Sequence, residues 1–393
     1  MRVIRTAFAN LFVMAGGIAI VAVPLQVLLW IPDYFSVLSV LPIPQRSFWH
    51  GHALLVGYSQ VVLGGYLLTR PGNRVIVPFS LFWLIAQISI FIPEPAGIYI
   101  GTFASISVFA LLFIHAGLQF FRAAKRWKSA LPGLVIGLLL LSEIIFQAGQ
   151  VLQEPSASEV ALRGVIWLLI ILVFLMGGRI IAAATSGALQ KRDMYQPYMA
   201  QGRLETYGVI ALLVTGLSDL LVLPVAITTF FGAVAATIIA RRLWNWRVWR
   251  VIDAFDLTSL HMGYAMLAIG LIFYICQISI GDAPSLVGLH GVMIGGFALL
   301  SITIMCRTVL QRLRFALVLP ITMRIASVCI LGAAITRMAA FQTVGTTEFL
   351  IASSLLWVAA FTLFLSTLVG IIWRFYKQPS SNGPPQNDHP FKT

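Results

Sequence analysis

Charged residues are scarce in this chain of 393 residues: Asp, Glu, Lys and Arg together make up 10% of it, against 59% hydrophobic residues. Soluble domains have roughly a quarter of their residues charged, so this composition excludes an ordinary water-soluble fold. The mean hydropathy of +0.94 points the same way. We therefore expect a protein whose surface faces lipid.

Acidic residues are scarcer than basic ones, with 13 against 26, which gives a net charge of +13. In a soluble protein this excess would suggest nucleic acid as a partner, but here the basic residues lie in short connections between apolar runs. Such connections are typical of loops retained in the cytoplasm. We expect two basic stretches to anchor helices at an anionic leaflet: Arg122, Lys125, Arg126 and Lys128 with Trp127, and Arg241, Arg242, Arg247 and Arg250 with Trp244, Trp246 and Trp249.

Cysteine is nearly absent, and Cys276, Cys306 and Cys329 stand singly inside apolar runs. This spacing excludes a CxxC-type metal or iron–sulfur site and predicts buried thiols without disulfides. The chain also lacks a CxxCH motif, so any haem would be held noncovalently. It has no Walker A loop, GxGxxG, HExxH or GxSxG sequence, which argues against ATP-driven transport and assigns no reaction.

Long apolar runs are abundant, and a run of about 20 residues crosses a bilayer as a helix. We expect an all-α, polytopic membrane protein with a single domain over residues 1–376 and a disordered tail over 377–393. The expected twelve spans are 8–30, 48–69, 75–93, 97–121, 130–152, 162–184, 204–222, 224–241, 257–279, 285–306, 316–338 and 349–374.

Charge tests this count of spans, because a wrong count would scramble the alternation of basic and acidic connections, and the alternation is clean. Basic residues collect on one side, and Asp33, Glu94, Glu154, Glu159, Asp282 and Glu348 collect on the other. Positive loops remain in the cytoplasm, so both termini are expected there.

Histidine is the commonest metal ligand in proteins, and the chain has six. By position in the spans, His50, His52 and His290 lie near the outer surface, whereas His261 and His115 lie near the inner one. Helical residues two apart point about 200° from each other, so His50 and His52 cannot both face one point on a regular helix. A hydrogen bond to a neighbouring helix is the alternative role for each of them.

Polar groups other than histidine also fall inside the apolar runs. Gly177-Gly178-Arg179 allows a close approach of a backbone or flat cofactor, and the Arg179 and Arg307 guanidinium groups suit carboxylates such as haem propionates. Alternatively, both arginines reach the lipid headgroups. Four further charged residues must pair or face a cavity, because a charge in the bilayer is costly: Glu143, Asp219, Arg324 and Arg337.

The motifs together resemble the NnrS family of bacterial membrane proteins. Trp49-His50-Gly51-His52 with the following Gly57 and Gly65-Tyr66-Leu67-Leu68-Thr69 is similar to the family's WHxHEM...G...GFLLT signature. The other matching segments are Met176-Gly177-Gly178-Arg179, Leu260-His261-Met262-Gly263-Tyr264, and Leu289-His290 with Gly295, Gly296 and Arg307. The resemblance covers nearly the whole chain, in the family's order.

This resemblance implies a haem-containing and possibly copper-containing protein of the bacterial inner membrane, linked to the nitric oxide response. It implies His50, His52, His261 and His290 as metal ligands, with Arg179 and Arg307 as further cofactor-binding residues. Nitric oxide or a related small molecule would be its partner, and nucleic acid would not.

Departures from the family pattern affect the expected centre. Ala53 and Leu54 stand where the family has Glu and Met, Ala182 replaces a Pro, and a GHxGR segment is missing after Arg307. Loss of a carboxylate beside a ligand histidine removes a group that would orient the imidazole. The sequence thus leaves open whether one of two centres has been lost.

Two other functions compete with haem binding. A proton-coupled secondary transporter without metal also suits twelve spans with both termini inside, but it explains the histidines poorly. A relative of the haem–copper oxidases is disfavoured, because the chain has neither an adjacent His–His pair nor an HxxxY arrangement.

Overall fold

The computed structural model describes residues 2–30, 48–68, 73–125, 127–194, 201–281, 286–340 and 346–377. Every regular element within these ranges is helical, which confirms the all-α expectation. The predicted tail lies outside the described residues from 378 onward, as do Asp33, Arg46 and Asp282 of the connections.

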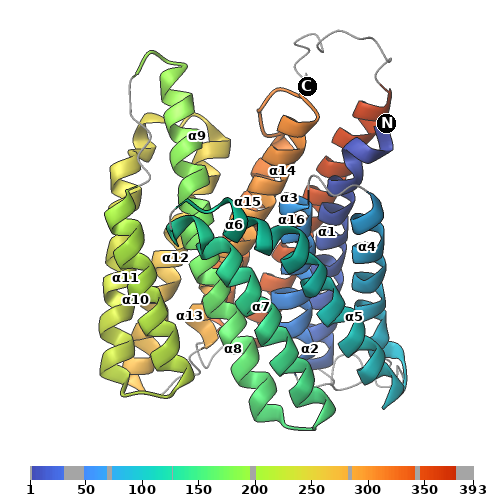
Figure 1. The fold of residues 1–393 in the computed structure, drawn as a ribbon. Coiled ribbons are helices and arrows are strands. Elements are labelled where there is room, and N and C mark those ends of the chain that lie inside the picture. The colour runs from blue at the N-terminus through green and yellow to red at the C-terminus, as the bar shows by residue number, and fades with distance from the viewer. Residues whose placement is uncertain are drawn as a thin grey trace. The chain divides into compact units, whose positions relative to one another are not determined.

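The helices follow one another along the chain as Figure 1 shows. The α-helices are α1 (Arg2–Trp30), α2 (Trp49–Gly51), α3 (Tyr58–Leu67), α4 (Asn73–Ile88), α5 (Ala96–Leu112), α6 (Leu118–Ala123), α7 (Trp127–Val151), α8 (Pro155–Leu172), α9 (Gly178–Gln190), α10 (Gly202–Leu220), α11 (Val225–Trp246), α12 (Phe255–Ile280), α13 (Leu286–His290), α14 (Leu299–Arg312), α15 (Ile321–Ala339) and α16 (Thr346–Lys377). The π-helices are η3 (His52–Gly57), η5 (Phe113–Gly117), η6 (Val173–Gly177) and η8 (Gly291–Ala298), and the 3₁₀ helices are η4 (Ser89–Phe91) and η7 (Val248–Arg250).

Ten helices among the described residues are long and apolar enough to cross a membrane, where the sequence predicted twelve. The two remaining predicted spans, 48–69 and 204–222, are helical over most of their length but more polar than the other ten. The first contains His50, His52 and Gln60, and the second contains Glu205 and Asp219. The predicted count is therefore corrected to ten spans, and the two exceptions contain residues of the sites described below.

Contacts along the chain divide it into two compact units. Unit 1 comprises Met1–Val165, Thr308–Leu317 and Phe361–Thr393, and unit 2 comprises Ile166–Arg307 and Val318–Ala360. In unit 1, α1 packs against α3, and α4 packs against α5. In unit 2, α11 packs against both α10 and α12, and η8 packs against α12 and α15.

Proline and glycine set several helix ends. Pro155 opens α8, where its missing N–H would have no helical partner, and Pro224 and Pro320 directly precede α11 and α15. Gly281 ends α12 with φ of 80°, a left-handed conformation that glycine adopts at little cost. The predicted break near Pro224 is confirmed, since α10 ends at Leu220 and α11 begins at Val225.

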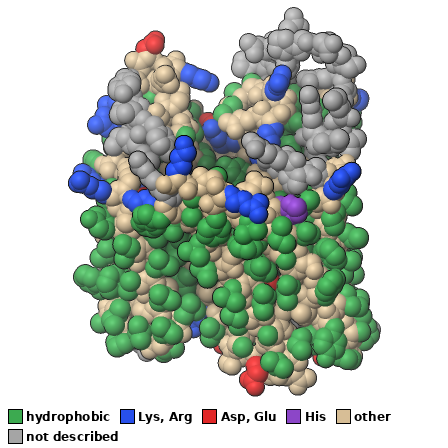
Figure 2. All heavy atoms as spheres, in the orientation of Figure 1, with side chains coloured by type: hydrophobic (Ala, Val, Ile, Leu, Met, Phe, Trp, Pro, Cys, Tyr) green, Lys and Arg blue, Asp and Glu red, His purple; other side chains and the backbone are tan. Residues whose placement is uncertain are grey.

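Hydrophobic side chains cover the flanks of the helices on the face drawn in Figure 2, and Lys and Arg side chains gather near one set of helix ends. Large apolar residues such as Phe103 and Ile335 are exposed, as a lipid-facing surface requires. The three cysteines are free. The expectation of burial is wrong for Cys276, which is exposed.

Gly288 marks the closest approach between α13 and α12. A Cβ atom at this position would lie 2.5 Å from the Cα atom of Tyr274, so the two backbones leave no room for a side chain. Helix packing in membranes depends on such small residues.

We expect Gly288→Ala to lower the unfolding free energy by about 1–3 kcal/mol, the usual cost of overpacking a well-packed core. Gly187→Ala in α9 is the matched control, because a Cβ atom at that position would have no neighbouring atom within 4 Å. Thermal unfolding in detergent, followed by tryptophan fluorescence, measures both variants. Equal melting temperatures for the two would contradict this packing.

Candidate functional site

Two polar clusters among the described residues, one in each unit, include residues that the sequence singled out. The His52 site, in unit 1, comprises His52, Glu143, Gln147, Thr102 and Phe146. The Arg242 site, in unit 2, comprises Arg242, Arg179, Glu205, Phe174, Tyr264 and Trp246.

His52 begins the π-helix η3 and pairs with Glu143 of α7. Its Nε2 lies 3.0 and 3.1 Å from the two carboxylate oxygens. Glu143 is fully buried, and a carboxylate only accepts hydrogen bonds, so Nε2 carries the proton. The imidazole also stacks on Phe146, with ring centroids 4.4 Å apart and an interplanar angle of 14°. These contacts fix the position of the ring and favour the form with a proton on Nε2.

Gln147 extends this network by one turn of α7. Its amide nitrogen donates to Glu143 Oε1 at 2.8 Å, and its amide oxygen accepts from Thr102 Oγ1 at 2.9 Å. The buried carboxylate therefore receives hydrogen bonds from both His52 and Gln147. Such satisfaction is what makes a buried charge tolerable.

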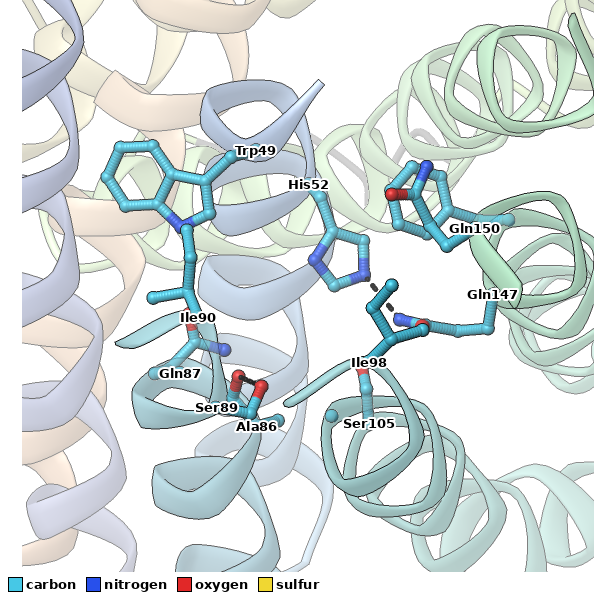
Figure 3. A pocket seen from close by; sticks show the side chains of 12 residues that line it. Trp49, His52, Ala86, Gln87, Ser89, Ile90, Ile98, Ser105, Gln147 and Gln150 are labelled. Carbon is cyan, nitrogen blue, oxygen red and sulfur yellow. Dashed lines mark hydrogen bonds between the residues drawn. The ribbon is translucent and has the colours of Figure 1, made fainter. Parts of the chain in front are cut away.

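A cavity of about 60 Å³ lies beside His52 in unit 1. Its lining is polar at several points and contains no Lys or Arg: Trp49, His52, Ala86, Gln87, Ser89, Ile90, Ile98, Gly101, Ser105, Phe146, Gln147 and Gln150. In Figure 3, one ring nitrogen of His52 faces Gln147, and the other lies on the side of Trp49. In the neutral imidazole with its proton on Nε2, that second nitrogen, Nδ1, presents a lone pair.

The other predicted ligands of the outer surface lie elsewhere. His50 points toward α1, where its Nδ1 lies 3.4 Å from the carbonyl oxygen of Ala22, so it diverges from His52 as the helical geometry predicted. His290 is the last residue of α13 in unit 2 and directly precedes η8. Among the described residues, no three His, Cys, Asp or Glu side chains come together as a metal-binding group.

His261 of α12 is 3% exposed, and its two ring nitrogens have different surroundings. Nδ1 lies 2.8 Å from the carbonyl oxygen of Leu257, which can only accept, so Nδ1 carries the proton. Nε2 is buried and has no hydrogen-bond partner among the described residues. The ring stands edge-on to Trp246, with centroids 6.1 Å apart. A backbone-bound Nδ1–H with a free Nε2 lone pair is the usual arrangement of a metal-ligating histidine.

Arg242 is wholly buried, although its sequence neighbourhood predicted a lipid anchor. Its guanidinium carbon lies 4.5 Å from the ring centroid of Phe174, 5.2 Å from that of Trp246 and 5.7 Å from that of Tyr264. Trp246 is buried as well, so the anchoring prediction is wrong for these two residues. Trp244 and Trp249 are exposed, as an anchor requires.

Glu205 is the only carboxylate of the Arg242 site, and Arg179 holds it in a two-point contact. Nε of Arg179 lies 3.2 Å from one oxygen, and Nη2 lies 2.7 Å from the other. Nη2 of Arg242 lies 3.8 Å from Glu205, too far for a hydrogen bond. Arg179 was singled out in the sequence, whereas Glu205 and Arg242 were missed as site residues.

Gly178 explains the adjacent glycines of the Gly177-Gly178-Arg179 sequence. A Cβ at Gly178 would lie 2.5 Å from Nη2 and 2.8 Å from Cζ of Arg242. The missing side chain therefore makes room for a guanidinium, where the sequence suggested a backbone or flat cofactor.

Three other charged residues that the sequence singled out have partners: an ion pair for Arg307, hydrogen bonds for Asp219 and an aromatic ring for Arg324. Arg307 forms an ion pair with Asp256 at the start of α12. Asp219 accepts hydrogen bonds from Trp167 Nε1 at 2.9 Å and from the Tyr274 hydroxyl at 2.6 Å. Arg324 lies over the Phe255 ring, at 5.8 Å from its centroid.

The π-helices mark the residues that the sequence singled out. His52 opens η3, His115 lies within η5, Gly177 closes η6 just before Arg179, and His290 precedes η8. A π-turn widens a helix locally and occurs often at functional sites. The shared pattern of His52 and His290, each with a glycine five residues later, corresponds to these turns.

An exposed ion pair links Arg192 and Asp253 outside the spans. Nη1 and Nη2 of Arg192 each lie 2.8 Å from a carboxylate oxygen. The hydrogen bond from Arg192 lowers the pKa of Asp253, and the same bond raises the pKa of Arg192. Solvent screens such a pair, so it contributes little to stability.

In a comparison with protein families, the family described as NnrS protein matches residues 2–375 of the chain. A search of curated proteins found none that matches the chain.

We expect His52→Leu to lower the unfolding free energy by about 3–5 kcal/mol, because it leaves the Glu143 carboxylate buried without its partner. The double variant His52→Leu/Glu143→Leu should recover much of that loss, since no charge remains to be paired. Denaturant unfolding in detergent completes the double-mutant cycle with Glu143→Leu. Losses that add to within about 0.5 kcal/mol would show that the two side chains are independent.

Proposed function

Because this chain belongs to the NnrS family of membrane proteins linked to the nitric oxide response, we propose that it binds haem, together with copper, and acts through them in that response. The family match over residues 2–375 supports the membrane and nitric oxide parts of this proposal. The donor atoms of two histidines support the cofactors, and each fits a different one.

His261 fits the haem iron. The observation that carries this assignment is its buried Nε2 without a partner among the described residues, with Nδ1–H bound to the Leu257 carbonyl. When bound, haem iron would supply a coordination site for nitric oxide. Arg179 and Arg307 are the propionate partners that the family resemblance implies, and each would exchange its present partner, Glu205 or Asp256, for a propionate.

His52 fits a single small metal ion better than haem. Its Nε2 is held by Glu143, so Nδ1 is the donor that remains, and the adjacent cavity of about 60 Å³ is far smaller than the roughly 300–1,000 Å³ of pockets for larger ligands. A carboxylate on the far ring nitrogen orients a ligand histidine and raises its basicity. We propose copper at this position, with His50 and His290 as the additional candidates from the family resemblance.

Glu143 takes the place that Ala53 leaves in this proposal. The family motif has a Glu directly after the second histidine, whereas here a carboxylate reaches the same imidazole from α7. In this proposal a different helix provides the orienting group, so Ala53 is compatible with a metal ion at His52.

We further propose that the protein lies in the bacterial inner membrane with both termini in the cytoplasm, because an even number of spans places both termini on one side and basic connections are retained in the cytoplasm. A proton-coupled transporter without metal is the second candidate. The buried His52–Glu143 pair beside a polar cavity favours it, since titratable groups at membrane depth often relay protons.

The test compares His261→Ala, His52→Ala and the control His115→Ala, all purified after expression with ample haem and copper. We expect His261→Ala to lose the Soret band and its shift with nitric oxide, His52→Ala to lose at least half of its copper while keeping haem, and the control to keep both.

Optical spectra and elemental analysis provide the readouts. A wild-type protein with neither haem nor copper would overturn the cofactors. Proton-driven uptake of a substrate by such metal-free protein in proteoliposomes would favour the transporter instead.

A further inference from the structure

The hydrogen bonds of Arg242 account for only one of its terminal nitrogens. Nη1 donates to the carbonyl oxygen of Phe174 at 3.1 Å and to the hydroxyl of Tyr264 at 2.7 Å. Nε and Nη2 are both buried, and neither has a hydrogen-bond partner among the described residues. These two nitrogens form one edge of the guanidinium, and their N–H bonds point in parallel. That edge is the fork that grips two oxygens of one planar anion.

In Arg179, the same Nε/Nη2 edge binds a carboxylate. Its own Nε and Nη2 hold the two oxygens of Glu205 at 3.2 and 2.7 Å. The equivalent edge of Arg242 has Glu205 only at 3.8 Å from Nη2. Among the residues that the structure describes, the site thus contains two guanidinium groups and one carboxylate, which leaves one positive charge in excess.

The surroundings of Arg242 fix the fork in place. Three aromatic rings, those of Phe174, Trp246 and Tyr264, lie within 5.7 Å of the guanidinium carbon, and Gly178 leaves room for the group on the side of α9. Cation–π contacts favour the charge but offer no hydrogen-bond acceptor. A buried guanidinium held in this way is preorganised for a ligand that brings both an acceptor pair and a negative charge.

We propose that the Nε/Nη2 edge of Arg242 binds a planar oxyanion of charge −1, the class that comprises carboxylates, nitrite and nitrate. The anion would complete the two hydrogen bonds and neutralise the excess charge of the site. Its source is either a free small oxyanion or the carboxylate of a larger bound group, such as a haem propionate. Binding of the free anion does not require the metal centres proposed above.

The test uses the full-length protein in detergent, prepared with and without haem, and titrated calorimetrically with sodium nitrate, sodium nitrite and sodium acetate. Sodium chloride is the comparison, because a spherical anion cannot use a two-point fork. We expect about one equivalent of each oxyanion to bind the haem-free protein, with at least tenfold weaker binding of chloride.

Arg242→Lys keeps the charge but removes the fork, so it should weaken oxyanion binding at least tenfold. Arg192→Lys is the matched control, because its fork is exposed and already bound to Asp253, and it should leave the affinity unchanged. If Arg242→Lys fails to fold, Glu205→Gln remains as a test. Removing the competing carboxylate should strengthen oxyanion binding severalfold.

The two preparations distinguish the sources of the anion. Binding to both forms would support a free oxyanion as the ligand, and binding to the haem-free form alone would support a haem carboxylate at the fork. No binding to either form, or equal affinity in the wild-type and Arg242→Lys proteins, would overturn the proposal. The Soret band is recorded on the same samples, so a failure of haem binding is seen separately from a failure of anion binding.

Discussion

The pairing of buried charges inside apolar helices is the constraint on which the rest of this structure depends. A membrane-embedded carboxylate or guanidinium has no water to solvate it, so its partners must come from other helices. Glu143 has His52 and Gln147, Glu205 has Arg179, and Arg307 has Asp256. These contacts fix which helices lie together within each unit and where polar chemistry is possible.

The two sites solve this problem differently. At the His52 site a closed set of hydrogen bonds satisfies the carboxylate, and what it leaves available is the Nδ1 lone pair of an oriented imidazole. At the Arg242 site aromatic rings surround the cation, and two of its nitrogens keep their hydrogen-bonding capacity. The first arrangement suits a metal cation or a neutral molecule, and the second suits an anion.

Composition alone was enough to predict the helical class, and proline and glycine positions such as Pro224 marked helix ends correctly. The sequence also singled out His52, Glu143 and Arg179, and the structure places all three in polar networks between helices. It failed on Arg242 and Trp246, because a basic, tryptophan-containing stretch at a helix end has the composition of a lipid anchor whether its side chains face inward or outward. Partners across helices, such as Glu143 for His52, depend on tertiary packing that no local pattern encodes.

The π-helices could not be predicted from the glycines that accompany them in the sequence. The sequence shows the glycines near His52, His115 and His290, but it does not show that the helix widens at each of them. The opposite holds at Ala53. The sequence indicates a lost carboxylate beside His52, but in the structure the carboxylate of Glu143 contacts His52 from another helix.

The most direct test of the account is a cryo-electron microscopy map of the protein purified with haem and copper supplied. The account predicts porphyrin density with its iron at Nε2 of His261, and a separate metal peak at Nδ1 of His52 with Glu143 still bound to Nε2. A map in which protein atoms pack against both ring nitrogens, and in which density for haem or metal lies elsewhere or is absent, would contradict it.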